Sequence, residues 1–99
     1  MRLTPGTASI IRAETRAIFG DQAQVRLFGS RVDDDQRGGD IDLLVELPRQ
    51  QTDGHRKSLT LAARLQIRLG DQRIDVLLID PETPPQPIHK QAIANGVLL

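Results

Sequence analysis

Apolar and polar positions along this 99-residue chain recur with two different periods, which predict three helices and three strands. Apolar side chains three and four residues apart are typical of an amphipathic helix, whereas strict alternation is typical of a half-buried strand. Thr4 and Pro5 mark the first helix start, and Gly20, Gly70 and Gly96 follow the helical segments as stop signals. The predicted elements are, in chain order, a helix over 4–20, strands over 24–28 and 40–47, a helix over 52–69, a strand over 73–80 and a helix over 87–96.

The apolar stripes predict which face of each helix is buried. In the first helix the predicted stripe consists of Ile10, Ile11, Ala13, Ala17 and Ile18. In the second helix it consists of Leu61, Ala62, Leu65 and Leu69. The last helix has Ile88 and Ala92 in register, and Asn95-Gly96 predicts a left-handed stop.

The strand over 40–47 alternates along its whole length, so its two faces differ in character. One face carries Ile41, Leu43, Val45 and Leu47, and the other carries Asp40, Asp42, Leu44 and Glu46. The strand–helix–strand unit over 40–80 predicts a crossover between parallel strands. The strand over 24–28, joined by a loop of about ten residues, is expected to pair antiparallel. We therefore predict one α/β (α+β) domain over residues 1–99, with a small three-stranded mixed sheet packed with helices in the order α-β-β-α-β-α.

The amino-acid composition argues against several classes of partner and site. The chain has 13 basic and 13 acidic residues and no net charge, which argues against a broad basic face for nucleic acid. Its only aromatic residues are Phe19 and Phe28, so a base-stacking platform is not expected either. The absence of cysteine excludes thiolate metal sites. No apolar run approaches the ~20 residues of a membrane helix, and a cytoplasmic protein is the expectation.

Three acidic residues are placed where they can act together. Asp40 and Asp42 project from the same strand face, roughly 6.6 Å apart along the strand. Asp75 lies near the start of the next parallel strand, and hence near the same sheet edge. Three converging carboxylates repel unless a divalent cation neutralises them, and oxygen ligands favour Mg²⁺ or Mn²⁺. The alternative for Asp75 is an ion pair with Arg73 on an exposed edge strand.

A candidate phosphate site lies upstream of the acids. Gly29 follows a strand and allows a phosphate to approach the backbone, while Ser30 offers a hydroxyl and an N–H group. Arg31 is either a phosphate contact or a surface charge, and Ser30 is also compatible with a plain helix cap. Together with the acids, which would hold two metal ions, this pattern indicates in-line attack on a phosphoryl group of a bound triphosphate by the two-metal route. His55 and His89 are isolated in the sequence and are expected at the surface.

These motifs resemble the minimal nucleotidyltransferases (MNT proteins) of the DNA polymerase β superfamily. The matching segments are LFGSR at 27–31, GDIDLLV at 39–45 and Asp75, and the resemblance covers almost the whole chain. It implies that Asp40, Asp42 and Asp75 are metal ligands and that Gly29 and Ser30 contact the phosphates of a nucleotide. The loop VDDDQRGG at 32–39 departs from the common family form, because Gly39 stands where serine is usual.

The resemblance also implies a partner and a reaction. Many MNT proteins are antitoxins of all-helical HEPN partners, and some transfer AMP from ATP to a tyrosine of that partner. We therefore expect an adenylyltransferase that uses Mg²⁺ or Mn²⁺ and acts on a HEPN-type protein; the alternative is an antitoxin that neutralises its partner by contact alone. The chain is also compatible with oligomerisation. Ile88, Ile93 and residues 97–99 are expected to form an exposed apolar element for a partner.

Overall fold

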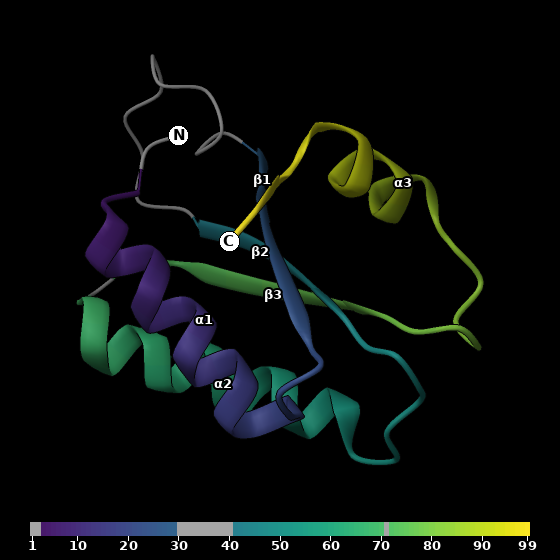
Figure 1. Cartoon of the computed structure of the whole chain (residues 1–99), viewed down its shortest axis with the longest axis horizontal. Coiled ribbons are helices and arrows are strands. Elements are labelled where there is room, and N and C mark those ends of the chain that lie inside the picture. The colour runs from purple at the N-terminus through teal and green to yellow at the C-terminus, as the bar shows by residue number, and fades with distance from the viewer. Residues whose placement is uncertain (1–2, 30–40, 71) are drawn as a thin grey trace.

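Within residues 3–29, 41–70 and 72–99, which the computed structural model describes, three helices pack on a four-stranded sheet (Figure 1). In chain order the elements are α1 (Pro5–Phe19), β1 (Gln24–Phe28), β2 (Ile41–Glu46), α2 (Gly54–Leu69), β3 (Ile74–Ile79), α3 (Pro87–Asn95) and β4 (Val97–Leu98). The helices and the first three strands agree with the predicted ones to within one or two residues at each end.

The sheet has the strand order β3-β2-β1-β4. β2 pairs parallel with β3 and antiparallel with β1, so both predicted pairings are confirmed. The prediction of three strands was wrong by one, because β4 adds to the free edge of β1. The main-chain N–H of Leu99 donates to the carbonyl oxygen of Val25 at 2.9 Å and extends this pairing. A strand of two residues is too short to show an alternation, which explains why the pattern missed it.

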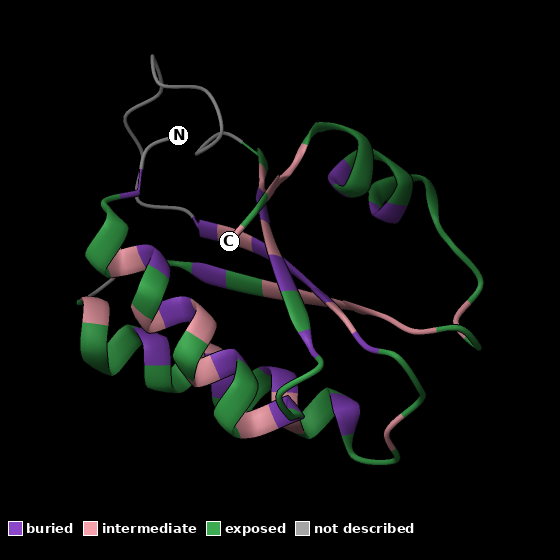
Figure 2. Ribbon diagram, viewed as in Figure 1, coloured by how far each residue is buried: buried purple, intermediate pink, exposed green. Residues whose placement is uncertain are grey.

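The main core lies between the sheet and the layer formed by α1 and α2 (Figure 2). Its fully buried side chains come from both helices and both central strands: Ile11, Leu27, Leu43, Val45, Leu61 and Leu65. The predicted stripe of α2 is confirmed, whereas Ala13 and Ala17 of α1 are exposed. Thr15 is buried in their place, and its hydroxyl donates to the carbonyl oxygen of Ile11 at 2.7 Å. This bond satisfies the polar atom and permits a threonine in the apolar interface.

A second, smaller buried layer lies on the opposite face of the sheet, where α3 packs (Figure 1). Leu44 and Ala92 are fully buried there, outside the main core cluster. His89, which was expected at the surface, is only 8% exposed. Its Nδ1 accepts the main-chain N–H of Gln86 at 2.9 Å, so the imidazole satisfies a donor at the start of α3. The two sheet faces therefore differ: one is fully covered by helices and the other only in part.

Gly96 joins α3 to β4 in an extended conformation, with φ −79° and ψ 165°. The left-handed stop predicted at Asn95-Gly96 was therefore wrong. The position needs glycine for a different reason, since a Cβ atom there would lie 2.3 Å from the carbonyl oxygen of Ala92 and 3.0 Å from that of Leu27. Lack of space, and not backbone handedness, selects glycine.

We expect Gly96→Ala to destabilise the protein by about 1–3 kcal/mol, the range of overpacked sites, because both neighbouring atoms belong to the backbone. Chemical denaturation measures this loss. Gly6→Ala is the matched control, since a Cβ at Gly6 meets only the Thr4 hydroxyl at 3.9 Å and alanine favours the helix. Equal stabilities of the two variants would contradict the close packing at Gly96.

Candidate active site

The pairing of β2 with β3 places Asp42 directly beside Asp75. The two residues are register partners on parallel strands, which lie about 4.8 Å apart in a sheet. Both side chains leave the sheet on the face away from the main core, because their neighbours Leu43 and Val76 pack into that core. The structure thus brings together two of the three predicted acids on the partly covered face.

Gly29 directly follows β1 and lies against Asp42. Its neighbour Phe28 is the register partner of Asp42, and Gly29 itself has φ +78°. A Cβ atom at Gly29 would lie 2.3 Å from Oδ2 and 3.2 Å from Cγ of Asp42. Both the backbone conformation and the space therefore require glycine here. Gly29 is the described part of the predicted phosphate site, so that site and the acids are contiguous.

Asp75 also has a cationic neighbour. Arg73 Nε lies 3.2 Å from Asp75 Oδ2, and the two side chains are 72% and 50% exposed. The ion pair proposed as the alternative role of Asp75 is thus present. It does not remove Asp75 from the site, because half of the side chain remains accessible to solvent.

A pocket of about 480 Å³ runs from α2 around the edge strand β3 towards α3. Its lining contains Phe28, Asp42, His55, Ser58, Leu59, Ala62, Arg73, Ile74, Asp75, Val76, Leu77 and Ile88. This volume lies within the range of small-molecule sites. The two carboxylates therefore open into a space that accommodates a ligand.

The contribution of α2 to this pocket was not predicted from the sequence. His55 is exposed, as expected, but it also lines the same pocket as Asp42 and Asp75. Ser58 and Leu59 follow it three and four positions later; Ser58 belongs to the buried stripe of α2, and Leu59 is exposed beside it. This spacing of three and four residues is the signal that places the three side chains on one side of the helix.

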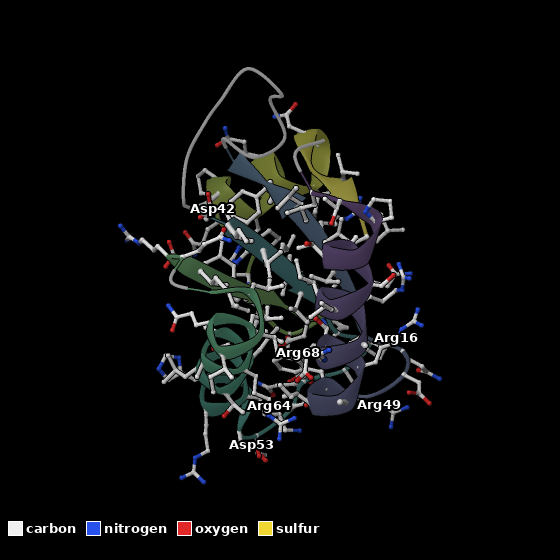
Figure 3. All side chains as sticks on the ribbon, turned by 90° about the vertical axis from the view of Figure 1, so that its left-hand side faces the viewer. Arg16, Asp42, Arg49, Asp53, Arg64 and Arg68 are labelled. Carbon is white, nitrogen blue, oxygen red and sulfur yellow. The ribbon has the colours of Figure 1, made fainter. Side chains whose placement is uncertain are left out.

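Several other charged groups among the described residues form ion pairs away from Asp42 and Asp75. Arg64 and Arg68 of α2 lie 3.5 and 3.1 Å from the carboxylate oxygens of Glu14, between the two helices. Figure 3 shows Arg64 and Arg68 in the lower half of the view and Asp42 in the upper half. On β1, Arg26 forms an ion pair with Glu46 of the neighbouring strand. In the part of the chain that the structure describes, Arg73 is thus the one arginine or lysine that lines the pocket.

The donors at the site suit a hard divalent cation. Two carboxylates side by side supply the oxygen ligands that Mg²⁺ and Mn²⁺ prefer. In residues 3–29, 41–70 and 72–99, no third histidine or acidic side chain joins them. The predicted third ligand, Asp40, lies outside the described residues, as do Ser30 and Arg31. Over the same described ranges, no helix is long and apolar enough to span a membrane.

Comparison with known proteins agrees with this geometry. A family model described as "Polymerase beta, Nucleotidyltransferase" matches residues 16–99. Among solved structures, the fold is similar to a chain in the crystal structure of a mutant toxin–antitoxin complex, MntA–HpeT, with a TM-score of 0.59 and 20% sequence identity. That similarity covers 88% of this chain but 66% of the other, so the protein spans slightly less than two thirds of that relative's length. No curated protein matches the sequence significantly.

The two findings support different conclusions. At 20% identity, the structural similarity establishes a shared fold. The family model supports more than the fold, because it matches residues 16–99, which include Gly29, Asp42 and Asp75 of the site. As the resemblance to minimal nucleotidyltransferases predicted, the chain belongs to the polymerase β nucleotidyltransferase family.

Proposed function

We propose that this protein transfers AMP from ATP to a hydroxyl group of a protein partner, with Mg²⁺ or Mn²⁺ as its cofactor. The observation that supports this activity best is the pairing of Asp42 with Asp75, with Gly29 packed against Asp42. Two ionised carboxylates at this spacing repel each other, and a protein that acts only through contact does not require them. Metal-dependent attack on the phosphoanhydride of a nucleoside triphosphate does require metal ligands of this kind.

The proposed reaction is an in-line displacement at the α-phosphorus of ATP. The acceptor oxygen forms a bond to this phosphorus, while the bond from phosphorus to the bridging oxygen of the β-phosphate breaks and pyrophosphate leaves with the electron pair. Bound Mg²⁺ or Mn²⁺ would neutralise the charge that develops on the phosphate oxygens. Asp42 and Asp75, together with Asp40, would hold that cation.

The remaining residues have separate roles in this proposal. Gly29 would let the phosphates approach the main chain, because no Cβ atom occupies the space. Ser30 and Arg31 would contact the same phosphates. Asp75, whose side chain is 50% exposed, is the carboxylate proposed to accept the proton of the acceptor hydroxyl.

We further propose that the acceptor belongs to a HEPN-type helical toxin and that this protein is its antitoxin. The similarity in fold to a chain of a toxin–antitoxin complex supports the pairing. An apolar surface beside the site supports a protein partner as well. Ile88, Ile93 and Leu98, here named the α3–β4 patch, are 47%, 41% and 51% exposed. Because Ile88 also lines the pocket with Asp42 and Asp75, a partner that covers the patch would reach the acids.

The outcome for the rest of the predicted apolar element is mixed. Val97 and Leu99 are only partly exposed, and Leu99 packs against the main core. The Arg12 side chain donates to the carbonyl oxygen of Leu99 at 3.2 Å, which fixes the residue close to α1. The α3–β4 patch is therefore smaller than the sequence predicted.

Co-expression with the product of the neighbouring gene tests the proposed function. We expect the two proteins to purify together and the partner to gain the mass of one AMP unit after incubation with ATP and Mg²⁺. The Asp42→Asn variant should retain association but lose the mass gain. Association without any mass gain in the unaltered protein would support the contact-only antitoxin, and absence of association would reject this partner.

A further inference from the structure

Arg73 combines a fixed backbone with an exposed side chain. Its carbonyl oxygen accepts the main-chain N–H of Ile41 at 2.8 Å, which anchors the residue where β2 and β3 begin to pair. Its side chain, in contrast, is 72% exposed. A long side chain on a fixed backbone can change the direction of its guanidinium group without disturbing the sheet.

The ion pair of Arg73 with Asp75 is weak enough for either side chain to take another partner. It consists of one pair of atoms, Nε and Oδ2, at 3.2 Å. Ion pairs this exposed contribute little to stability, since solvent screens them and ordering two side chains costs entropy. A guanidinium group has five N–H donors in a planar fork, so donors remain for another acceptor.

Arg73 and a divalent cation would compete for Asp75. A cation held by Asp42 and Asp75 would bind carboxylate oxygens, including those that Arg73 contacts. Two positive groups on one carboxylate repel each other, so the more weakly held group would leave. Because Arg73 lines the same pocket as both acids, its side chain remains beside a ligand bound there.

The geometry points to Arg73 as a nucleotide-binding residue that exchanges partners: it pairs with Asp75 in the ligand-free protein and with a phosphate of the nucleotide once a divalent cation occupies Asp75. The planar guanidinium fork matches the oxygen pair of a phosphate group. The inference rests on the proposed function, which supplies the nucleotide. It assigns to Arg73 a role beyond the ion pair with Asp75.

Two binding titrations on Arg73→Gln test this inference without any measurement of turnover. The first follows Mn²⁺ alone by the electron paramagnetic resonance of the free ion. We expect the variant to bind Mn²⁺ roughly threefold more tightly or better, because a competing positive charge has been removed. The second measures ATP with saturating Mg²⁺ by calorimetry, and here we expect affinity to fall about tenfold or more through loss of a charge-assisted contact.

Arg56→Gln is the matched control. Arg56 is an exposed arginine of α2 outside the lining of the pocket, and the substitution removes the same unit of charge. Both affinities should stay within about twofold of the unaltered protein, because salt screens distant surface charges. Opposite changes in the two affinities of Arg73→Gln, absent from the control, would support the exchange of partners.

Any of the following results would overturn the inference. If Arg73→Gln binds Mn²⁺ more tightly but ATP with unchanged affinity, Arg73 competes with the cation for Asp75 and does not contact the nucleotide. If both affinities are unchanged, Arg73 contributes to neither binding site. If the unaltered protein binds Mn²⁺ but not ATP, the proposed function fails together with the phosphate contact. If it binds both and Arg73→Gln binds ATP equally well, the inference fails alone.

Discussion

Asp42→Asn is expected to lower AMP transfer about a thousandfold or more. A bound metal contributes several kcal/mol of charge stabilisation in the transition state, and about 1.4 kcal/mol corresponds to a factor of ten in rate. Asparagine keeps the shape of the side chain but removes its charge, so the fold should be retained. Transfer of labelled AMP to the partner measures the rate, and circular dichroism checks the fold.

Asp21→Asn is the control for this substitution. Asp21 is an exposed acid in the turn after α1, outside the lining of the pocket. Its loss changes the net charge by the same amount and should leave transfer unaltered. If Asp42→Asn transferred AMP at the rate of the unaltered protein, the assignment of Asp42 as a metal ligand would be rejected.

Gly29→Ala is expected to abolish ATP binding. The new Cβ atom would lie 2.3 Å from Asp42 Oδ2, so the carboxylate has to move out of its position beside Asp75. The backbone at φ +78° adds strain of about 1–3 kcal/mol for a residue with a side chain. Calorimetry with ATP and Mg²⁺ measures the loss of binding, and thermal denaturation measures the loss of stability.

Gly20→Ala separates the effect of backbone strain from that of the collision. Gly20 has φ +110°, but no atom lies within 4 Å of a Cβ built there. This variant should therefore lose stability to a similar degree and still bind ATP. Equal ATP affinity in Gly29→Ala and Gly20→Ala, both folded, would show that the nucleotide binds elsewhere.

The fold was predictable where the pattern of apolar and polar residues in the sequence was long and regular. β2 alternates except at Leu44, and its faces are those that the alternation predicted, with Leu43 in the main core and Asp42 on the other side. The crossover to β3 then placed Asp75 beside Asp42, because the parallel register leaves little freedom. The predicted position of Asp75 near the same sheet edge as Asp42 is thus confirmed, and the structure adds that the two acids are register partners.

The errors arose where tertiary contacts decide. His89 is buried because α3 turns its imidazole to the N–H group of Gln86, an arrangement for which an isolated histidine gives no signal. Position 96 has no room for a Cβ atom because two carbonyl oxygens lie close to it. One of them belongs to Leu27, which is far away in the sequence. The ion pair of Arg73 with Asp75 was predicted as an alternative to a metal role for Asp75. The structure shows that Asp75 forms this ion pair while half of its side chain remains accessible to solvent.

The parallel pairing of β2 and β3 also has a consequence for the kinetics of folding. Asp42 and Asp75 become neighbours only after the sixteen-residue helix α2 and its connections have closed the crossover. Such long-range contacts form slowly compared with a helix. A divalent cation would find its two ligands in the native state and not in the unfolded chain, so it would stabilise the native state by mass action. If β2 and β3 pair after the folding barrier, Mn²⁺ would slow unfolding while leaving the refolding rate nearly unchanged.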